Sequence, residues 1–199
     1  MPWTLINLEE FGEKMEYKMF LMALRFCIKA FHEGEWRKDG RPYETHPMRV
    51  AQILIYFGII DEITLIIALL HDIPEHIGIK FIEEIEGSYG REIADNVRLL
   101  TRTKGQDFGE YCEDILQSLK AILVKLADRL HNFRNMIKRI GTGPFFTEDR
   151  LDRQRKETDR HIIPMAEKAI ILYPESAEVI GRMLKELKRA VQMANMILE

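Results

Sequence analysis

The sequence has few of the residues that would cross-link a protein chain. Only two of its 199 residues are cysteine, Cys27 and Cys112, which is too few for a disulfide framework. Both lie among apolar residues at helical spacing, so we expect them to be buried free thiols. Such thiols are typical of proteins in a reducing compartment. The core is therefore expected to be held together by side-chain packing alone.

Long hydrophobic runs and targeting signals are also missing. No apolar run reaches the ~18 residues that a membrane-spanning helix needs. The first residues, MPWTLINLEEFGEKMEYK, mix acidic and apolar side chains and do not resemble a signal peptide. Together these absences predict a cytoplasmic protein with no membrane partner.

An excess of charge of one sign is lacking as well. Lysine and arginine number 29 and aspartate and glutamate number 32, which gives a formal net charge of −3 and a pI near 6.1. A chain with this balance is not expected to bind nucleic acid through bulk electrostatic attraction. A local basic pocket for a small phosphorylated ligand stays compatible with it.

The alternation of apolar and polar residues that marks a half-buried strand is absent. Apolar residues instead recur at helical spacing along nearly the whole chain. This pattern predicts an all-α, compact helical bundle, and the length suits one domain over residues 1–199. Helices are expected over about 9–33, 46–58, 62–72, 79–86, 90–101, 107–118, 118–140, 148–171 and 175–197.

Several residues mark the ends of these helices. Asp61 is a predicted N-cap, and Pro74 is expected to kink or end a helix. Pro174 marks the joint before the last helix, at about 175–197. That helix is rich in Met, Lys and Arg. We interpret it as a peripheral addition or a contact between copies of the chain, which leaves a homo-oligomer open.

The segment LLHDIPEH, at 69–76, places titratable residues directly after the wholly apolar TLIIALL. A helix that is apolar on every side is expected to be buried, and His71 and Asp72 lie at its end. Burying a charged carboxylate without a partner is costly. A metal ion is one partner for Asp72. A core histidine joined to it by an ion pair or hydrogen bond is the alternative.

Two further segments carry similar chemistry. ETHPMRV places a histidine at the start of one helix, and VKLADRLHNFRN places an aspartate on an otherwise apolar helix face. Combined, these segments would form a site of two imidazoles and two carboxylates: His46, His71, Asp72 and Asp128. Such ligands suit Mn²⁺, Fe²⁺ or Zn²⁺ better than Ca²⁺. Taken alone, Asp128 could also be a surface residue.

In these motifs the sequence resembles the hydrolase domain of the RelA/SpoT-type alarmone proteins, which are HD-domain metal-dependent phosphohydrolases. That domain carries RKxGxPYxxHPxxVA, LLHDxxED and KLADRLHNxR in this order. The chain has RKDGRPYETHPMRVA, LLHDIPEH and KLADRLHNFRN, together with TRTKG at 101–105 and ETDRHIIPMA at 157–166. The resemblance covers about residues 20–170. No stretch resembles the family's synthetase or regulatory domains, so a small stand-alone hydrolase is expected.

The resemblance implies hydrolysis of guanosine tetra- and pentaphosphate at the 3′ position, with release of pyrophosphate and with Mn²⁺ as the metal. It assigns the role of metal ligand to four residues: His46, His71, Asp72 and Asp128. Arg37 resembles the arginine that stacks on the guanine, and Lys38 its basic neighbour near the phosphates. Asn132 resembles an asparagine that contacts the nucleotide. Glu75 resembles the first acid of a pair implicated in handling the attacking water.

The chain departs from the family at His76, where the second acid of that pair would stand. An imidazole can accept a proton near neutral pH, so His76 is a candidate catalytic base beside Glu75. It could also be an exposed histidine at a helix end, or mark a different substrate. Tyr43 is expected to pack the preceding loop against the site, with a nucleotide contact as the alternative.

Other cations near these motifs could contact phosphates, although a solvated surface charge is the default for each: Arg41, Arg102, Lys104, Arg129 and Arg134. Three functions stay open. The first is an alarmone 3′-pyrophosphohydrolase, and the second is an HD phosphohydrolase that acts on another nucleotide or phosphate ester. The third is a degenerate module that binds a nucleotide without turnover.

Overall fold

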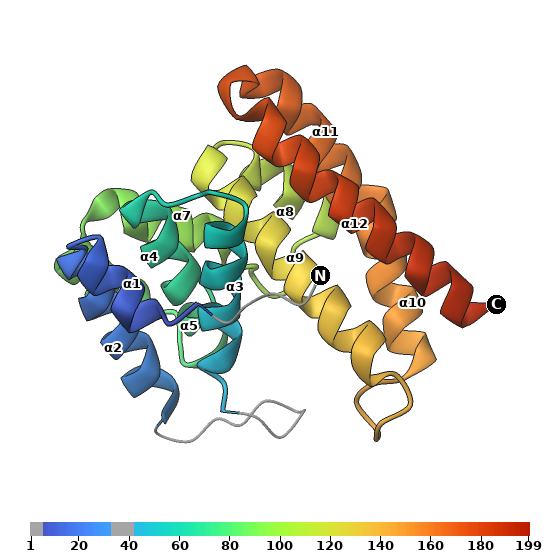
Figure 1. Cartoon of the computed structure of the whole chain (residues 1–199), viewed down its shortest axis with the longest axis horizontal. Helices are drawn as coiled ribbons and strands as arrows, with labels where there is room; N and C mark the ends of the chain where they lie inside the picture. Colours follow the sequence, from blue (N-terminus) through green and yellow to red (C-terminus); the bar gives the residue numbers. More distant parts are fainter. Residues whose placement is uncertain (1–5, 33–41) are drawn as a thin grey trace. The chain divides into compact units, whose positions relative to one another are not determined.

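The structure is a computed structural model that describes residues 6–32 and 42–199 (Figure 1). The elements in this part of the chain are all helices, which confirms the all-α prediction. The chain divides into two compact units, residues 1–104 (unit 1) and 105–199 (unit 2). Each unit is described by itself, and the single domain expected over 1–199 stays a prediction.

Unit 1 is built around a buried central helix. Its helices are α1 (Leu8–Lys14), α2 (Lys18–His32), α3 (Thr45–Tyr56), α4 (Glu62–Leu70), α5 (Ile73–His76), α6 (Phe81–Tyr89) and α7 (Arg91–Leu100). Every residue of α4 from Thr64 to Leu70 is buried, and α4 packs against α2, α3 and α7. The side chain of Asp61 accepts a hydrogen bond from the N–H of Thr64 at 2.9 Å. This bond confirms the predicted N-cap.

The single helix expected over about 9–33 is wrong, because α1 and α2 are separate. The turn between them holds Glu16 at a φ of 57°. The left-handed region costs a non-glycine residue roughly 1–2 kcal/mol, so apolar spacing alone gives no signal for it. Close packing accompanies the turn. A Cβ on Gly12 would lie 2.7 Å from Cδ2 of Leu21, so a larger residue at this position would require neighbouring side chains of α2 to shift.

Unit 2 is organised around a long amphipathic helix, α9. Its helices are α8 (Phe108–Ile115), α9 (Leu119–Arg139), α10 (Glu148–Glu157), η1 (Thr158–Ile162), α11 (Ile163–Leu172), η2 (Pro174–Ser176) and α12 (Ala177–Leu198). One face of α9 is buried, and α10, α11 and α12 pack against it. Figure 1 shows α11 and α12 lying side by side.

The continuous helix expected over about 148–171 is interrupted by the π-helical turn η1. Pro164 lies in the first turn of α11 and has no N–H to donate to the preceding turn. The hydroxyl of Thr158 also bonds to the carbonyl of Gln154 at 2.7 Å. Both features weaken the regular α-helical ladder at this point, and single-turn π segments are the usual form of such an interruption.

The last helix, α12, has one buried face and one exposed face. Met183 is buried, whereas Met193 and Met196 are 52% and 76% exposed. The helix expected at the periphery therefore contributes to the core of unit 2. None of the helices in the described ranges is both long and apolar enough to cross a membrane. Both cysteines are free and buried, as predicted.

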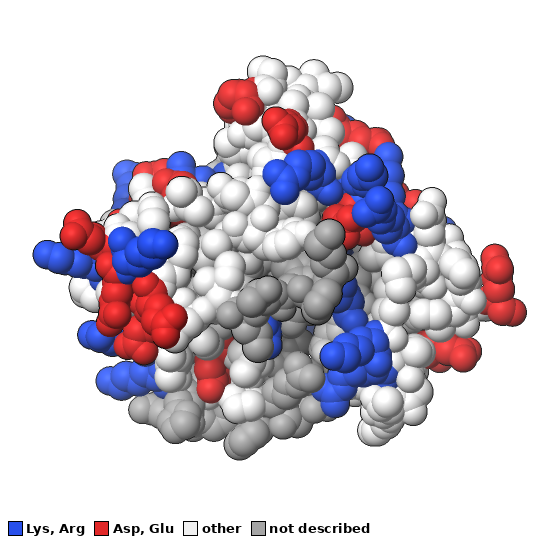
Figure 2. All heavy atoms as spheres, viewed as in Figure 1, with Lys and Arg blue, Asp and Glu red and all other residues white. Residues whose placement is uncertain are grey.

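The viewed surface carries charges of both signs. In Figure 2, Lys and Arg side chains alternate with Asp and Glu side chains and with wide uncharged areas. This distribution agrees with the small formal net charge of −3.

Candidate metal centre

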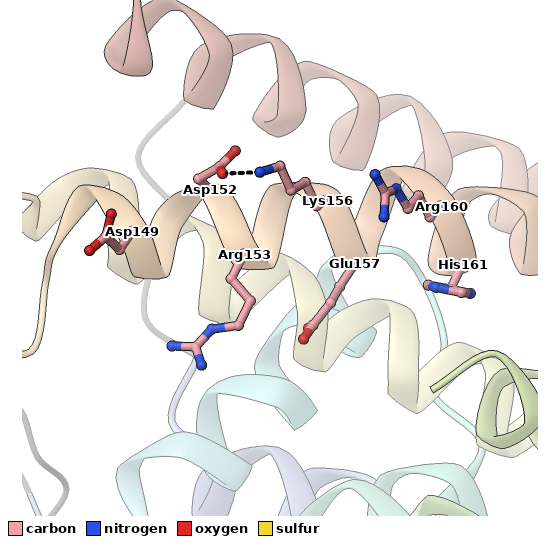
Figure 3. Close-up of a pocket in the computed structure, with 7 residues that line it drawn as sticks. All are labelled: Asp149, Asp152, Arg153, Lys156, Glu157, Arg160 and His161. Atoms are coloured by element: carbon pink, nitrogen blue, oxygen red, sulfur yellow. Dashed lines mark ion pairs between the residues drawn. The ribbon is translucent and has the colours of Figure 1, made fainter. Parts of the chain in front are cut away.

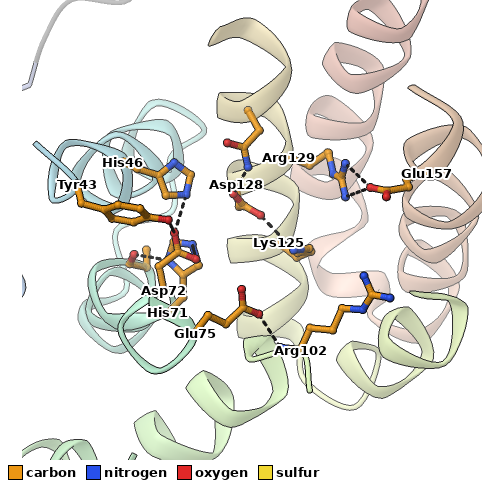
Figure 4. Close-up of polar contacts among 12 residues, drawn as sticks. Tyr43, His46, His71, Asp72, Glu75, Arg102, Lys125, Asp128, Arg129 and Glu157 are labelled. Atoms are coloured by element: carbon orange, nitrogen blue, oxygen red, sulfur yellow. Dashed lines mark hydrogen bonds and ion pairs between the residues drawn. The ribbon is translucent and has the colours of Figure 1, made fainter. Parts of the chain in front are cut away.

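His46, His71 and Asp72 come together in unit 1 (Figure 4). His46 lies in the first turn of α3, His71 caps the end of α4, and Asp72 precedes α5. One donor atom from each side chain lies within 4.8 Å of the other two. The two histidines are only 2% and 4% exposed. The predicted grouping of these three residues is therefore present, and their role as metal ligands stays a prediction.

The carboxylate of Asp72 lies between the two imidazoles. Its Oδ2 is 3.2 Å from Nε2 of His46, and its Oδ1 is 3.2 Å from Nε2 of His71. The histidines come from the ends of two helices, and the rigid, buried α4 holds the second of them in place. Two acceptor oxygens and two ring nitrogens thus point at the same small volume. This arrangement is the donor set that a divalent transition metal prefers.

The tautomer of His71 gives an independent reason to expect a cation. Its Nδ1 lies 2.8 Å from the carbonyl oxygen of Ala68, so Nδ1 carries the proton of the neutral ring and Nε2 carries the lone pair. Nε2 is buried and forms no hydrogen bond, although it lies 3.2 Å from Oδ1 of Asp72. In this arrangement a lone pair on Nε2 of His71 faces a lone pair on Oδ1 of Asp72. A metal ion would satisfy both, in the pattern usual for histidine ligands.

Tyr43 packs against this cluster. Its ring stacks on Phe31 with 4.7 Å between centroids and an interplanar angle of 23°. Its hydroxyl donates a hydrogen bond to Oδ2 of Asp72 at 3.3 Å and also contacts Nε2 of His76. Tyr43 therefore packs against the cluster, whereas its packing of the preceding loop, which lies outside the described residues, and its contact with substrate stay predictions.

Pro74 ends the buried helix as predicted, because α4 stops at Leu70 and Pro74 lies in the first turn of the short α5. Glu75 and His76 follow and are exposed. With Asp72 they form a second group whose donor atoms lie within 4.8 Å of one another. The Oε1 atom of Glu75 accepts a hydrogen bond from the backbone N–H of Arg102 at 2.6 Å. Glu75 is thus tied to the TRTKG segment.

Asp128 belongs to unit 2, where it lies on α9 and is 7% exposed. Its Oδ1 accepts a hydrogen bond from Nδ2 of Asn132 at 2.6 Å, and its Oδ2 lies 3.1 Å from Nζ of Lys125. The predicted sharing of one helix side by Asp128 and Asn132 is confirmed. Membership of Asp128 in one site with the three unit 1 residues stays a prediction. Sequence reasoning missed Lys125, although its spacing of three residues from Asp128 could have revealed the pair.

Arg129 has a structural environment rather than that of a solvated cation. It is 6% exposed, its guanidinium bonds to Oε2 of Glu157 at 3.2 Å, and it lies 5.4 Å from the ring centroid of Phe108. The expectation that Arg129 is a solvated surface charge is therefore wrong. His161 also packs on Phe108, edge to face, with 5.5 Å between the ring centroids. This contact gives His161 a packing role in unit 2.

The pKa of the Cys27 thiol is influenced by the carboxylates near the cluster. Burial raises the pKa of Cys27 well above its usual value, and the carboxylates of Glu44 and Asp72 raise it further. The sulfur therefore stays protonated at neutral pH. Because the thiolate is the form that binds metals, Cys27 is a packing residue in this state.

A shallow hollow of about 220 Å³ lies along α10 and η1 in unit 2 (Figure 3). Two of its acids, Asp152 and Glu157, already form ion pairs with basic side chains. Asp152 contacts Arg155 at 2.7 Å and Lys156 at 2.6 Å. Hydrogen bonds from Lys156 and Arg155 lower the pKa of Asp152. The hollow has no orphaned donor set like that around His71, so the unit 1 cluster is the better candidate centre.

The predicted nucleotide contacts Arg37 and Lys38, as well as Arg41, lie outside the described residues. Their roles stay predictions that rest on the sequence motif.

Comparison with known proteins places these residues in a family. The family model of the HD domain matches residues 23–109. This range contains His46, His71 and Asp72 and ends before Asp128. Residues 23–109 therefore match the HD domain, and the chain is similar to (p)ppGpp hydrolases.

Two relatives illustrate the similarity. The chain is 36% identical over 115 residues to the bifunctional (p)ppGpp synthase/hydrolase SpoT of Escherichia coli (strain K12), covering 53% of this chain and 16% of that protein. It is 30% identical over 176 residues to a probable GTP pyrophosphokinase of Mycobacterium leprae (strain TN), covering 77% of this chain and 21% of that protein. The chain therefore spans about a fifth or less of the length of these relatives.

A solved structure covers more of the chain. It is the metazoan ortholog of SpoT described as hydrolysing ppGpp and acting in starvation responses. The match has a TM-score of 0.68 and 26% identity, and it covers 86% of this chain and 94% of the other. The all-α HD-type fold predicted from the sequence agrees with this similarity.

Proposed function

We propose that this protein is a metal-dependent phosphohydrolase that removes pyrophosphate from the 3′ position of guanosine tetra- or pentaphosphate. The observation that carries the proposal is the buried cluster of His46, His71 and Asp72, in which Nε2 of His71 has a lone pair and no hydrogen bond. The cluster lies in an HD domain whose relatives include proteins named for this hydrolysis.

Mn²⁺ is the metal of this proposal because the resemblance to the alarmone hydrolases implies it; two imidazoles with carboxylates also suit Fe²⁺ or Zn²⁺. When bound, such an ion lowers the pKa of a bound water and polarises a phosphoryl oxygen. The residues that would hold it are His46, His71 and Asp72, with Asp128 as the fourth predicted ligand. Glu75 is exposed near Asp72, and its Oε1 accepts a hydrogen bond from the N–H of Arg102; this position supports a role for its carboxylate in accepting a proton from the attacking water.

The substrate is expected to be positioned by groups around this centre. Arg37 would stack on the guanine, Lys38 would contact the phosphates, and Asn132 and Tyr43 would contact the nucleotide. Hydrolysis consumes one water and releases guanosine diphosphate and pyrophosphate from the tetraphosphate. The buried free thiols of Cys27 and Cys112 suit a reducing compartment. We therefore place the activity in the cytoplasm.

The test is a hydrolysis assay with guanosine tetraphosphate and Mn²⁺, run beside a panel of nucleoside mono-, di- and triphosphates. We expect pyrophosphate release from the tetraphosphate, abolished by a chelator and restored by added Mn²⁺. The matched control is His71→Ala, which removes one predicted ligand. Nucleotide binding without any turnover would contradict the proposal and favour a degenerate binding module.

His76 favours a second candidate, a phosphohydrolase of the same kind with a different nucleotide or phosphate ester as substrate. An imidazole in place of an acid changes the charge and reach of a group beside the reaction centre. Selective turnover of another member of the panel would support this candidate over the alarmone.

A variant of Arg37 tests the predicted contact with the guanine directly. Arg37→Ala should raise KM for the tetraphosphate by about 10-fold with a smaller change in kcat, because stacking binds ground state and transition state alike. Steady-state kinetics measure the two parameters separately. An unchanged KM would remove Arg37 from the substrate site.

A further inference from the structure

The hydroxyl of Tyr43 links Asp72 and His76 through two hydrogen-bond contacts. The Tyr43 hydroxyl lies 3.3 Å from Oδ2 of Asp72 and also contacts Nε2 of His76. Figure 4 shows the hydroxyl pointing at the Asp72 carboxylate. The Tyr43 ring packs against two other rings, those of Phe31 at 4.7 Å and His76 at 4.3 Å between centroids. These contacts restrict the movement of the hydroxyl.

Counting protons assigns a direction to both bonds. A carboxylate of Asp72 accepts only, so the single hydroxyl proton of Tyr43 is donated to Oδ2. The contact between Tyr43 and His76 then needs a proton from the ring. Nε2–H of His76 must donate to the Tyr43 oxygen, which leaves the lone pair of the neutral ring on Nδ1. His76 thus donates a hydrogen bond to Tyr43, and Tyr43 donates one to Asp72.

This direction gives a reason for a histidine at position 76. An ionised acid at the same place would accept rather than donate, and it would compete with Asp72 for the one Tyr43 proton. With His76, each of the two bonds has its own proton. Bonds of this kind orient metal ligands, and the loss of one typically costs 10–100-fold in affinity for the metal.

We propose that Tyr43 is a positioning residue for the Asp72 carboxylate, and that His76 holds Tyr43 in place by donating Nε2–H to its oxygen. The inference rests on the proposed function only in taking Asp72 as a metal ligand. It assigns His76 a task that is separate from proton transfer to or from the substrate.

The first test measures Mn²⁺ binding by titration calorimetry without nucleotide. Tyr43→Phe should weaken binding by about 10-fold, because the hydroxyl no longer orients Asp72. The matched control is Tyr17→Phe, which removes a hydroxyl that donates to the Ile60 carbonyl at 2.9 Å in the same unit. The control should bind Mn²⁺ as the unaltered protein does. Equal affinities for Tyr43→Phe and the unaltered protein would overturn the proposal.

The second test asks whether the two residues act together. His76→Gln keeps an N–H donor near the place of Nε2, whereas His76→Leu has none. The His76→Gln variant should retain nearly full affinity for Mn²⁺. The His76→Leu variant should bind Mn²⁺ several-fold more weakly. In a Tyr43→Phe background the two variants should be indistinguishable, since the acceptor is gone. If His76→Leu lowers affinity by the same factor in both backgrounds, His76 does not act through Tyr43.

The third test reads the tautomer directly, by the ¹⁵N chemical shifts of the His76 ring in the metal-free protein. We expect the Nε2–H form, and an Nδ1–H form would overturn the assignment even if Mn²⁺ failed to bind. These readouts involve no substrate. If they come out as expected but guanosine tetraphosphate is not hydrolysed, the proposed function fails and the positioning role stands.

Discussion

Two largely buried carboxylates, one in each unit, have similar exposure and different surroundings. The side chain of Asp72 is 15% exposed and that of Asp128 is 10% exposed. Asp72 faces the ring nitrogens of His46 and His71. Asp128 faces the ammonium of Lys125 and the amide of Asn132. The described neighbours of Asp72 are two imidazoles, whereas Asp128 has an ammonium beside it.

The difference shows that burial alone does not identify a metal ligand. A buried carboxylate must have its charge compensated, and the nature of the partner decides what the site can still bind. Around Asp72, the lone pair on Nε2 of His71 forms no hydrogen bond. Around Asp128, Lys125 compensates the charge. We therefore expect the unit 1 cluster to dominate metal binding, and Asp128 to bind the ion only by sharing its charge with Lys125.

The largest effect is expected from breaking the unit 1 cluster. His71→Ala or Asp72→Ala should lower Mn²⁺ affinity and hydrolysis by more than about 100-fold, because each removes a ligand rather than a supporting bond. Far-UV circular dichroism should show that helicity is kept. Full activity in either variant would mean that the ligand assignment is wrong.

Asp128→Ala tests whether the unit 2 carboxylate binds the same ion. We expect loss of metal-dependent activity of similar size, again with helicity largely kept. Calorimetry with Mn²⁺ separates a ligand from a merely structural residue. If the variant binds Mn²⁺ as tightly as the unaltered protein does, Asp128 is not the fourth ligand.

Lys125→Met sharpens the comparison by removing the cation that compensates Asp128. The variant should lose about 2 kcal/mol in the free energy of unfolding without metal, less than a fully buried pair because the lysine is partly exposed. Added Mn²⁺ should stabilise the variant more than the unaltered protein, since the ion then replaces the missing charge. Urea unfolding with and without Mn²⁺ measures both effects. Equal stabilisation of the two proteins would separate Asp128 from the metal.

The smallest effect is expected at a carboxylate that serves only the fold. Asp61 caps α4 through the N–H of Thr64 at 2.9 Å. Asp61→Ala should lower the free energy of unfolding by about 1 kcal/mol, and Asp61→Asn should have little effect because it keeps the acceptor. Neither variant should change Mn²⁺ affinity. A large loss of affinity in Asp61→Asn would show that the cap also positions His71 at the other end of α4.

Local sequence accounts for much of the fold and for the nearest part of the site. The apolar run TLIIALL predicts a buried helix, and Pro74 predicts its end, so the positions of His71 and Asp72 follow from adjacent residues. Asp61 was predictable for the same reason, since a cap acts within one helical turn. His46 needed the long-range packing of α3 on α4 to join the cluster.

The features that sequence missed depend on contacts between distant residues or on unfavourable backbone geometry. The turn at Glu16 requires a positive φ that glutamate seldom adopts. The contact of Tyr43 with His76 joins residues 33 positions apart, and no periodicity predicts it. Arg129 looked like a surface cation because its partner Glu157 lies 28 positions along the chain.

The most direct test of the metal centre is a crystal of the protein grown with Mn²⁺ and measured at the manganese absorption edge. The anomalous signal should show one ion bound by Nε2 of His46, Nε2 of His71 and the Asp72 carboxylate, with Asp128 as the fourth ligand. An ordered crystal in which the ion is absent, or bound away from those side chains, would contradict the account.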